Sequence, residues 1–473
     1  MKTSIQEILN FEPQGQKIEV YGWVRAFRNE QFVALNDGSS LQNLQIVLPL
    51  GMFSEEILKN IQVGTAFFAQ GLLQASLGKG QTMEVIAEKI EILGTSENYP
   101  IQPKKHSLEF LREVAHLRLR TQTFGAIFRI RHHLAQAVHR FFDEKGFFYI
   151  HTPIITAADA EGAGETFQVT TLNLEKLPKT KEGQVDFSQD FFGQTTHLTV
   201  SGQLEGELAA MGLGKIYTFG PTFRSENSNT TRHLSEFWMI EPEIAFADLN
   251  DNIILATDFL KFVCQQVLEK CKTDLTFLQE REQEEERNLP QNQRKIAPLL
   301  ARIEQIIQVD FERLTYTEAI ELLKKSKKYK EKKFQFLPEW GQDLQSEHER
   351  YLAEEHFKKP VIITDYPAEF KAFYMRLNED QKTVAAMDIL FPGIGEMVGG
   401  SQREERLEVL LEKCKTMHIH IETIDWYLDT RRYGSCVHSG FGVGFERLMM
   451  FLTGMNNIRD VIPFPRTPKN VKF

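Results

Sequence analysis

The sequence has few cysteines and no long apolar run, and each of these absences excludes a class of protein. Its 473 residues include four cysteines, and no two of them form a CxxC pair. This usage argues against a disulfide framework and against a zinc site built on cysteine. No run approaches the ~18 consecutive apolar residues that a membrane-spanning helix needs, and Glu7 stands where a signal peptide would be apolar. We therefore expect a cytoplasmic protein with no membrane partner.

Two common phosphate-binding motifs are also missing. Residues 71–80 contain a Gly-Lys pair but lack the spacing and the Ser or Thr of a P-loop. Residues 440–444 read Gly-Phe-Gly-Val-Gly and lack the third glycine position of a dinucleotide-binding fingerprint. If the chain binds a nucleotide, it must hold it in another way.

The charge is distributed unevenly along the chain. A net charge of -10 for the whole chain opposes the binding of a polyanionic partner. Between residues 100 and 146, however, nine Lys and Arg residues stand against four acidic residues. Such a basic segment permits nucleic-acid binding, and a solvated helix face is the alternative interpretation.

The first hundred residues read as a small all-β unit. Five β-rich runs bounded by turn residues cover residues 17–27, 31–35, 41–48, 65–73 and 82–93. Five short strands favour an OB-fold, whose strand face binds oligonucleotides. Prolines at 100 and 103 then indicate a linker, and apolar positions from 110 to 142 recur at helical spacing. The rest reads as a long α/β segment.

Three polar segments in that long part carry candidate chemistry. In residues 214–243, two strand-like runs flank a polar loop with Arg224, Arg232 and His233, and four glutamates lie nearby at 226, 236, 241 and 243. Guanidinium groups bind phosphate in a bidentate way, and carboxylates bind Mg²⁺ or an ammonium group. A structural hairpin with exposed charges explains the same pattern equally well.

The second segment, residues 439–448, places three glycines two residues apart on one face of a strand. A flat ring could lie on that bare backbone under Arg447, or a helix could pack tightly against it.

In the third segment, residues 387–403, Asp388 and Glu396 are joined across a turn and could share a hydrated Mg²⁺. Either acid could equally be an ordinary turn residue.

Together these segments resemble the class II aminoacyl-tRNA synthetases. Phe-Arg-Ser-Glu at 223–226 with Arg-His-Leu-Ser-Glu-Phe at 232–237 resembles motif 2, and residues 440–448 resemble motif 3. Residues 147–153 look like motif 1, whose proline lies at the dimer interface of that family. The stretches 373–406, 426–434 and 457–468 are similar to the asparaginyl-tRNA synthetases within the subgroup that also holds the aspartyl and lysyl enzymes.

The resemblance implies a fold and a domain order. It implies an α/β (α+β) class II synthetase catalytic domain built on an antiparallel sheet, with an N-terminal all-β OB-fold barrel. The expected parts are an anticodon-binding domain at 1–100, a hinge at 101–135 and a catalytic domain at 136–473 with a charged helical insertion at about 265–350. A homodimer is expected from the resemblance alone.

The resemblance also implies roles for residues of the nucleotide site, where Arg224 would hold the α-phosphate and stabilise charge during attack. Glu226 would orient the adenine end of ATP, and Arg232 and His233 would hold the outgoing pyrophosphate. The other implied nucleotide-binding residues are Phe237 and Arg447, which would stack on the two faces of adenine, and Gly442 and Gly444 beneath it. Asp388 and Glu396 would hold Mg²⁺.

For the amino acid, the resemblance implies that Glu161, Ser201 and Gln203 bind the α-amino group and the reacting end. Aspartyl enzymes carry a Lys where this chain has Gly206, so one cation is missing. Arg403 can donate to a side-chain oxygen and Glu241 can accept from an amide NH₂. Such a pocket suits L-asparagine, and rejection of aspartate can reach ~10⁴-fold. An acidic residue also occupies the Glu241 position in aspartyl relatives.

The implied macromolecular partner is tRNA(Asn), whose anticodon the barrel would read. Phe32 would stack on the central uridine and Gln45 would read its edge, with Arg25 and Arg28 near phosphate; Phe32 could instead be a core residue. The predicted activity is ATP-dependent charging of tRNA(Asn) with asparagine. Three rivals are an aspartyl enzyme of relaxed specificity, an ammonia-dependent asparagine synthetase and a non-catalytic tRNA-binding paralogue. His418 and His420 alternate as on a strand and receive no role.

Overall fold

The computed structural model describes residues 2–76, 78, 80–158, 166–287, 289–290, 294–295 and 297–473. The chain folds into two compact units, Met1–Ile130 with Phe473, and Arg131–Lys472. The unit boundary falls inside helix α5 (Gln122–Glu144) and within the segment 101–135, whose role as a hinge stays a prediction. Among the described residues, every helix is too short or too polar to cross a membrane.

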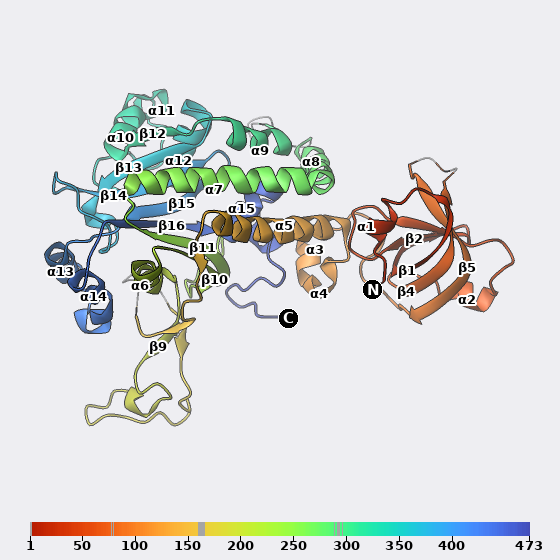
Figure 1. Ribbon diagram of the computed structural model, residues 1–473, viewed down its shortest axis with the longest axis horizontal. Helices are drawn as coiled ribbons and strands as arrows, with labels where there is room; N and C mark the ends of the chain where they lie inside the picture. Colours follow the sequence, from red (N-terminus) through yellow and green to blue (C-terminus); the bar gives the residue numbers. More distant parts are fainter. Residues whose placement is uncertain are drawn as a thin grey trace. The chain divides into compact units, whose positions relative to one another are not determined.

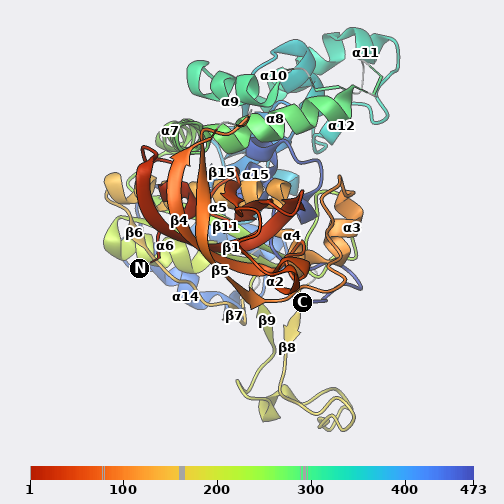
Figure 2. The ribbon, with the colours of Figure 1, turned by 90° about the vertical axis from the view of Figure 1, so that its right-hand side faces the viewer.

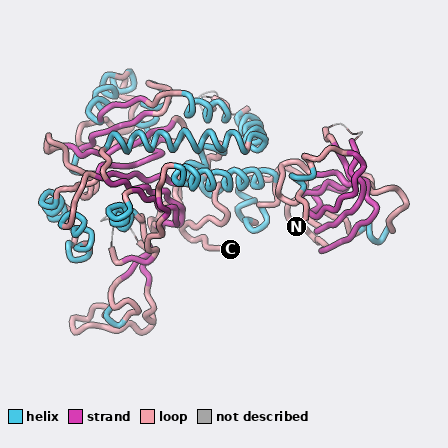
Figure 3. The backbone as a smooth tube through the Cα atoms, viewed as in Figure 1, coloured by secondary structure: helices cyan, strands magenta, loops and turns pink. Residues whose placement is uncertain are grey.

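The strands of the first unit curve around one another (Figure 3). They form a closed barrel of five strands in the order β1-β2-β3-β5-β4. All neighbouring strands are antiparallel except β3 and β5, which are parallel. The strands are β1 (Gln14–Arg28), β2 (Phe32–Asn36), β3 (Leu44–Val47), β4 (Ala66–Ala75) and β5 (Met83–Gly94). This is the N-terminal OB-fold barrel that the sequence predicts.

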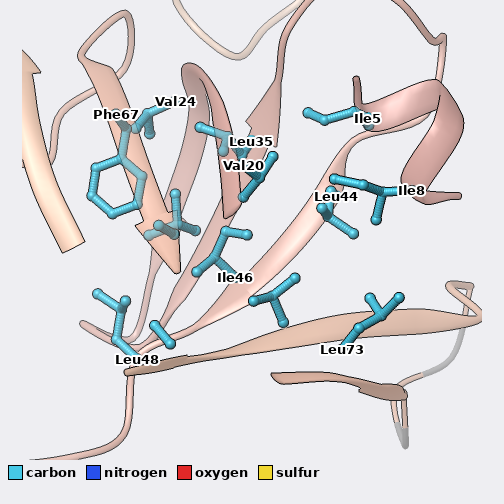
Figure 4. Packing of buried hydrophobic residues seen from close by; sticks show 14 of the residues in the cluster. Ile5, Ile8, Val20, Val24, Leu35, Leu44, Ile46, Leu48, Phe67 and Leu73 are labelled. Carbon is cyan, nitrogen blue, oxygen red and sulfur yellow. The ribbon is translucent and has the colours of Figure 1, made fainter. Parts of the chain in front are cut away.

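Alternating apolar residues fill the interior of this barrel. Figure 4 shows Val20, Val24, Leu35 and Ile46 packed around a common centre, and the short helix α1 (Ile5–Ile8) adds both of its isoleucines to the same cluster. Burying each such side chain contributes about 1.5–3 kcal/mol. Because successive side chains of a strand point to opposite faces, the residues between these core positions face outward.

The second unit is built on an eight-stranded sheet of order β12-β13-β14-β15-β16-β11-β10-β6. Only the two edge strands, β12 and β6, pair in parallel with their neighbours. The strands are β6 (Phe148–Tyr149), β10 (Lys215–Phe223), β11 (Glu236–Ala245), β12 (Glu312–Thr315), β13 (Val361–Pro367), β14 (Thr383–Phe391), β15 (Gly395–Gln402) and β16 (His438–Gly444). The sheet is therefore dominated by antiparallel pairs, as expected for a class II synthetase catalytic domain.

Helices cover both faces of this sheet (Figure 1). On one face, Tyr217 of β10 stacks on Phe142 of α5, and Phe441 of β16 contacts Phe259 of α7 (Leu249–Lys270). On the other face, α6 (Gln203–Leu213) packs against β10 and β11. The α6 side remains open enough to hold the site described below.

Two further features were not specified by the sequence pattern. A small sheet of β7 (Ile155–Thr156), β9 (Thr196–Leu198) and β8 (Gln168–Val169) carries an arm that protrudes from the second unit (Figure 2). The charged segment at about 265–350 contains α8 (Lys272–Glu286) and α9 (Leu299–Gln308), but it also supplies the edge strand β12.

The prediction that His418 and His420 alternate on a strand is wrong. His418 follows helix α13 (Leu407–Thr416) in a turn with a positive φ of 57°, and His420 precedes a short 3₁₀ helix. Alternation over three residues is too short to distinguish a strand from a turn.

Candidate active site

One face of the large sheet carries the candidate site. Along β11, Phe237, Met239, Glu241 and Glu243 are spaced two apart and therefore share a face. Strand register extends this face sideways, because residues directly opposite each other point the same way. The pairs that extend it are Thr218–Glu241, Glu243–Gly440, Gly440–Ser401 and Asp388–Gly399. Antiparallel pairing thus gathers residues nearly 200 positions apart.

The predicted nucleotide residues line one cavity of about 220 Å³ on this face. Met239, Glu396 and Glu446 complete its charged and apolar walls. The predicted residues found there are Arg224, Glu226, Arg232, His233, Phe237, Gly442, Gly444 and Arg447. The structure therefore brings all eight together, while their individual roles stay predictions.

The two arginines expected to contact ATP are held in different ways. The Arg224 guanidinium lies 5.5 Å from the centre of the Phe237 ring, within the range of a cation–π contact. Arg447, on the first turn of α15 (Phe445–Thr453), donates through Nη1 to the carbonyl oxygen of Glu396 at 2.7 Å. Both side chains therefore lie at the wall of the nucleotide cavity, and Arg447 also interacts electrostatically with the acids Glu349 and Glu396.

The loop between β10 and β11 supplies the outer end of the cavity. His233 Nδ1 lies 3.0 Å from the Ser228 hydroxyl and 2.5 Å from that of Thr230, which fixes the ring within the loop. Burial and the nearby charges of Arg447 and Arg350 lower the pKa of Arg232. The outer end is therefore a concentration of positive charge that an anion would relieve.

The glycines of β16 do not form one bare face. The carboxylate of Glu243 occupies the space beside Gly440, where a Cβ atom would stand 2.2 Å from its Oε1. Beside Gly442, the Met239 methyl group lies 3.0 Å from the corresponding position. The surface available to a ring is therefore limited to Gly442 and Gly444, with Met239 as its neighbour.

A second cavity of about 240 Å³ adjoins the first and is lined by the predicted amino-acid residues. Those that the structure describes are Ser201, Gln203, Glu241 and Arg403. Glu161 lies outside the described residues. The two cavities share Arg224, Met239, Glu396 and Gly442.

Glu241 is fixed by hydrogen bonds from three neighbours. Its carboxylate accepts from the Ser201 hydroxyl, from the backbone N–H of Gly202 at 3.0 Å and from the Thr218 hydroxyl at 3.2 Å. A buried carboxylate stabilised by several donors remains an acceptor, which suits an ammonium or amide NH₂ group.

Arg403 is paired with Glu243, a residue to which the sequence reasoning gave no specific role. Arg403 donates through Nε to Glu243 Oε2 at 3.1 Å and through Nη2 to the other carboxylate oxygen. Glu207 lies behind, with Oε1 3.8 Å from Arg403 Nε. Burial, together with the charges of Glu207 and Glu241, raises the pKa of Glu243. The only sequence signal was its position two residues after Glu241, on the same strand face.

Glu207 itself is completely buried and anchors the wall behind Arg403. It accepts from Tyr427 at 2.7 Å and from Arg431 at 2.8 Å, both on helix α14 (Asp425–Arg432), and His438 Nε2 lies 3.0 Å away. The charge of Arg431 and a hydrogen bond with His438 outweigh burial and hold the pKa of Glu207 well below its usual range. The guanidinium of Arg403 is thus oriented by two fixed acids.

Asp388 and Glu396 face a common space above Gly399. A Cβ atom on Gly399 would stand 3.1 Å from Glu396 Oε1 and 3.6 Å from Asp388 Oδ1, so the glycine leaves that space open. Asp388 Oδ2 accepts from Lys371 at 3.0 Å, which leaves Oδ1 directed toward Glu396. Burial and the charge of Asp388 raise the pKa of Glu396.

This pair fits the chemistry of a magnesium ion that also binds substrate phosphates. Mg²⁺ prefers oxygen ligands and is commonly held by one or two carboxylates plus phosphate and water. Among the described residues, three or more His, Cys, Asp or Glu side chains nowhere form a preformed metal cluster. The two acids are therefore suited to hold a metal together with a nucleotide rather than alone.

Unit 1 presents a second candidate surface on the outside of its barrel. Phe32 alternates with core residues, is half-buried and lies outside the core cluster, so it is not a core residue. Gln45 occupies the same outer face of β3 and donates to Glu84 at 2.9 Å. Arg25 Nη2 lies 3.5 Å from Asn36, and Arg28 pairs in register with Phe32. The structure thus collects an aromatic ring, an amide and two cations on the outer surface of neighbouring strands.

Comparison with known proteins agrees with this geometry. The family model described as tRNA synthetases class II (D, K and N) matches residues 107–468. The chain therefore belongs to the class II tRNA synthetases, a family of ATP-dependent aminoacyl-tRNA ligases.

Within that family, the chain is similar to asparagine–tRNA ligases. It is 56% identical to the one from Cytophaga hutchinsonii over 479 residues, with all of both chains covered, and 55% identical to the one from Bacteroides fragilis, with 100% and 99% covered. The crystal structure of asparaginyl-tRNA synthetase from Pyrococcus horikoshii complexed with asparaginyl-adenylate matches with a TM-score of 0.83 and 30% identity, covering 100% of this chain and 99% of that one.

Proposed function

We propose that this chain activates L-asparagine with ATP and transfers it to the 3′ end of tRNA(Asn). In the first step an asparagine carboxylate oxygen attacks the α-phosphorus, and the bond to the β-phosphate breaks with its electron pair going to pyrophosphate. In the second step a terminal ribose hydroxyl of the tRNA attacks the acyl carbon and AMP leaves. Neither step requires a nucleophile from the protein.

The observation that carries this proposal is the junction of the two cavities. Arg224 and Glu396 line both the nucleotide cavity and the amino-acid cavity. The reacting phosphate and carboxylate must meet at that junction, where the Arg224 guanidinium can stabilise charge that develops on the phosphate. Holding two reactants in such neighbouring sites lowers the entropic part of the barrier.

Selection of asparagine is proposed to follow from the charges behind the second cavity. Arg403 is already paired with Glu243, so its positive charge is compensated before the side chain of a substrate arrives. Glu241 can accept from the amide NH₂ of asparagine, whereas the carboxylate of aspartate would face it with like charge. Asp388 and Glu396 are proposed to hold Mg²⁺, which would neutralise phosphate charge when bound.

Two structural features support the proposed partners. The outer face of the barrel, with Phe32 for stacking and Gln45 for edge contacts, suits the bases of a single-stranded anticodon loop.

Around Pro153, four apolar side chains are between 41% and 55% exposed, namely Phe148, Tyr149, Ile154 and Ile155. We propose that a second copy covers them in a homodimer, which light scattering can test. Localisation in the cytoplasm is proposed because the sequence has only four cysteines and no CxxC pair.

The direct test is ATP–pyrophosphate exchange measured with asparagine and with aspartate, followed by charging of tRNA(Asn) transcripts. The proposal expects exchange that depends on asparagine and transfer of labelled asparagine to the tRNA. Exchange supported by aspartate alone would overturn the specificity, and the absence of any exchange would support a non-catalytic tRNA-binding protein.

A further inference from the structure

A larger cavity, of about 1160 Å³, lies beyond the outer end of the nucleotide cavity. It is enclosed by the loop before β11, helix α9, the segment that begins at α12 (Ser346–Arg350), the turn at 392–394 and the end of α15. It shares Arg232, Arg447 and Ile458 with the nucleotide cavity. The two spaces are therefore neighbours at the end where the phosphates of ATP are expected to lie. Apart from the expected contacts of Arg232 and Arg447 with ATP, the roles proposed above do not involve the lining of the larger space.

The lining of this cavity is strongly basic. Two acidic residues, Glu354 and Glu355, also reach it. The cations that carry the argument are Arg232, Lys295, Arg302, Arg350, Lys358 and Arg447. A ligand that fits them must be anionic.

Internal ion pairs do not cancel this charge. Lys295 and Arg302 both pair with the carboxylate of Glu282, at 2.7 Å and 2.8 Å. Because one acid compensates only one of these two cations, the three side chains together keep a charge of about +1. Arg350 pairs with Glu354 at 3.5 Å, and Glu355 pairs with Lys328 outside the lining.

Lys358, Arg232 and Arg447 supply the excess charge. Among the residues that the structure describes, none of these three side chains forms an ion pair within 4.0 Å, and Lys358 is exposed at the cavity. Burial and the charges of Arg447 and Arg350 lower the pKa of Arg232 despite the opposing charges of Glu349 and Glu354, so an added anion would stabilise its guanidinium. Arg232 and Arg447 adjoin the nucleotide cavity, whereas Lys358 lies next to helix α9, whose Gln305 donates to its carbonyl oxygen at 2.8 Å.

We propose that this cavity is a binding site for linear condensed phosphates longer than pyrophosphate, which extends from the place where Arg232 is expected to hold the pyrophosphate that leaves ATP. A single pyrophosphate fills only part of the space, whereas a longer linear chain can contact more of the cations that line it. The part about pyrophosphate as a product rests on the proposed function. The binding of tripolyphosphate rests on the cavity alone.

Calorimetric titration of the full chain with phosphate, pyrophosphate and tripolyphosphate tests the proposal. The experiment is run with the chain alone and with a saturating non-hydrolysable asparaginyl-adenylate analogue, which carries no β- or γ-phosphate. Affinity should rise with chain length, and tripolyphosphate should still bind when the analogue is present. Equal affinities for the three anions, or loss of tripolyphosphate binding with the analogue, would overturn it.

Two matched variants distinguish binding inside this cavity from electrostatic attraction of the anion to the protein as a whole. Lys358→Ala should weaken tripolyphosphate binding about tenfold, the effect of one ion pair near a protein surface. Lys324→Ala removes the same charge from the exposed side of helix α10 (Tyr316–Lys325), outside the cavity lining, and should change the affinity less than twofold. Equal effects of both variants would contradict the proposal and indicate attraction to the whole protein.

The outcome is also separable from that of the proposed function. If the chain binds tripolyphosphate with dependence on Lys358 but shows no asparagine-dependent exchange, the cavity assignment stands and the function fails. If exchange occurs normally but Lys358→Ala changes neither tripolyphosphate binding nor the KM for pyrophosphate in exchange, the function stands and the cavity assignment fails.

Discussion

A Cβ atom added to Gly206 of α6 would stand 3.6 Å from Cγ of Glu243, the acid that pairs with Arg403. The position where aspartyl relatives carry a lysine therefore faces this ion pair directly. In this chain Glu243 has Arg403 as its ion-pair partner, and the pair is electrically balanced. The cation that is missing at Gly206 would therefore have contacted Glu243, the acid that pairs with Arg403.

The first prediction uses this contact. Gly206→Lys should place an ammonium group beside Glu243, which releases part of the positive charge of Arg403 for a substrate carboxylate. We expect the ratio of kcat/KM for aspartate to that for asparagine to rise at least about tenfold in pyrophosphate exchange, or ~1.4 kcal/mol.

Gly206→Ala is the matched control, because its Cβ would make only ordinary contacts of 3.4 Å with Ile216 and 3.6 Å with Glu243. It should leave the ratio unchanged. A similar ratio in both variants would show that the ammonium group is not the cause.

The second prediction concerns pH and Lys413 of α13. Its ammonium group donates to the carbonyl oxygen of Met375, which lines the amino-acid cavity, and burial lowers its pKa to about 8. Between about pH 8 and 10.5 the unfolded chain therefore binds more protons at Lys413 than the folded chain does. The contribution of Lys413 to the free energy of unfolding consequently rises with pH over this range. Below pH 8 the cost of burying the charge is fully present.

Comparison of wild type with Lys413→Met measures this effect. The melting temperature of the wild type relative to the variant should increase from pH 7.5 to pH 9.5. A difference that stays constant across this range would mean that Lys413 titrates normally.

The third prediction separates the barrel from the catalytic unit. Phe32→Ala should raise the KM for tRNA about tenfold, because stacking of a base on an aromatic ring contributes about 1–3 kcal/mol. Pyrophosphate exchange, which needs no tRNA, should be unaffected.

Phe11→Ala removes another exposed ring of the same unit and serves as the control. Its KM for tRNA should remain that of the wild type. If Phe32→Ala leaves tRNA charging intact, the outer face of β2 is not the anticodon surface.

The fourth prediction concerns magnesium. Removal of divalent cations with EDTA should abolish exchange, and added Mg²⁺ should restore it. Glu396→Gln should raise the Mg²⁺ concentration needed for half-maximal exchange, because one of the two carboxylates facing Gly399 loses its charge. An unchanged requirement for Mg²⁺ in this variant would assign the metal to other groups.

Much of this site was predictable because its chemistry is local in sequence. The hairpin around Arg224, the glycine strand before Arg447 and the turn between Asp388 and Glu396 all form where residue pattern indicates them. Their assembly in one pair of cavities follows from strand order, which the sequence implied only through a resemblance.

What could not be predicted depends on contacts between distant segments. The partner of Arg403 could have been any of several acids, and only the register of β11 with β16 and β15 places Glu243 beside it. The large basic cavity combines two residues of recognised motifs, Arg232 and Arg447, with residues of α9 and α12, which carry no motif. The strand β12 was hidden in a charged segment because an edge strand of four residues has little pattern of its own.

The central claim is that a nucleotide cavity and a charge-balanced amino-acid cavity meet at Arg224. Calorimetric competition between non-hydrolysable asparaginyl- and aspartyl-adenylate analogues tests it most directly, because each analogue fills both cavities at once. The account predicts that the asparaginyl analogue binds at least about 100-fold more tightly, and that Arg224→Ala weakens both analogues. Equal binding of the two analogues by the wild type would contradict it.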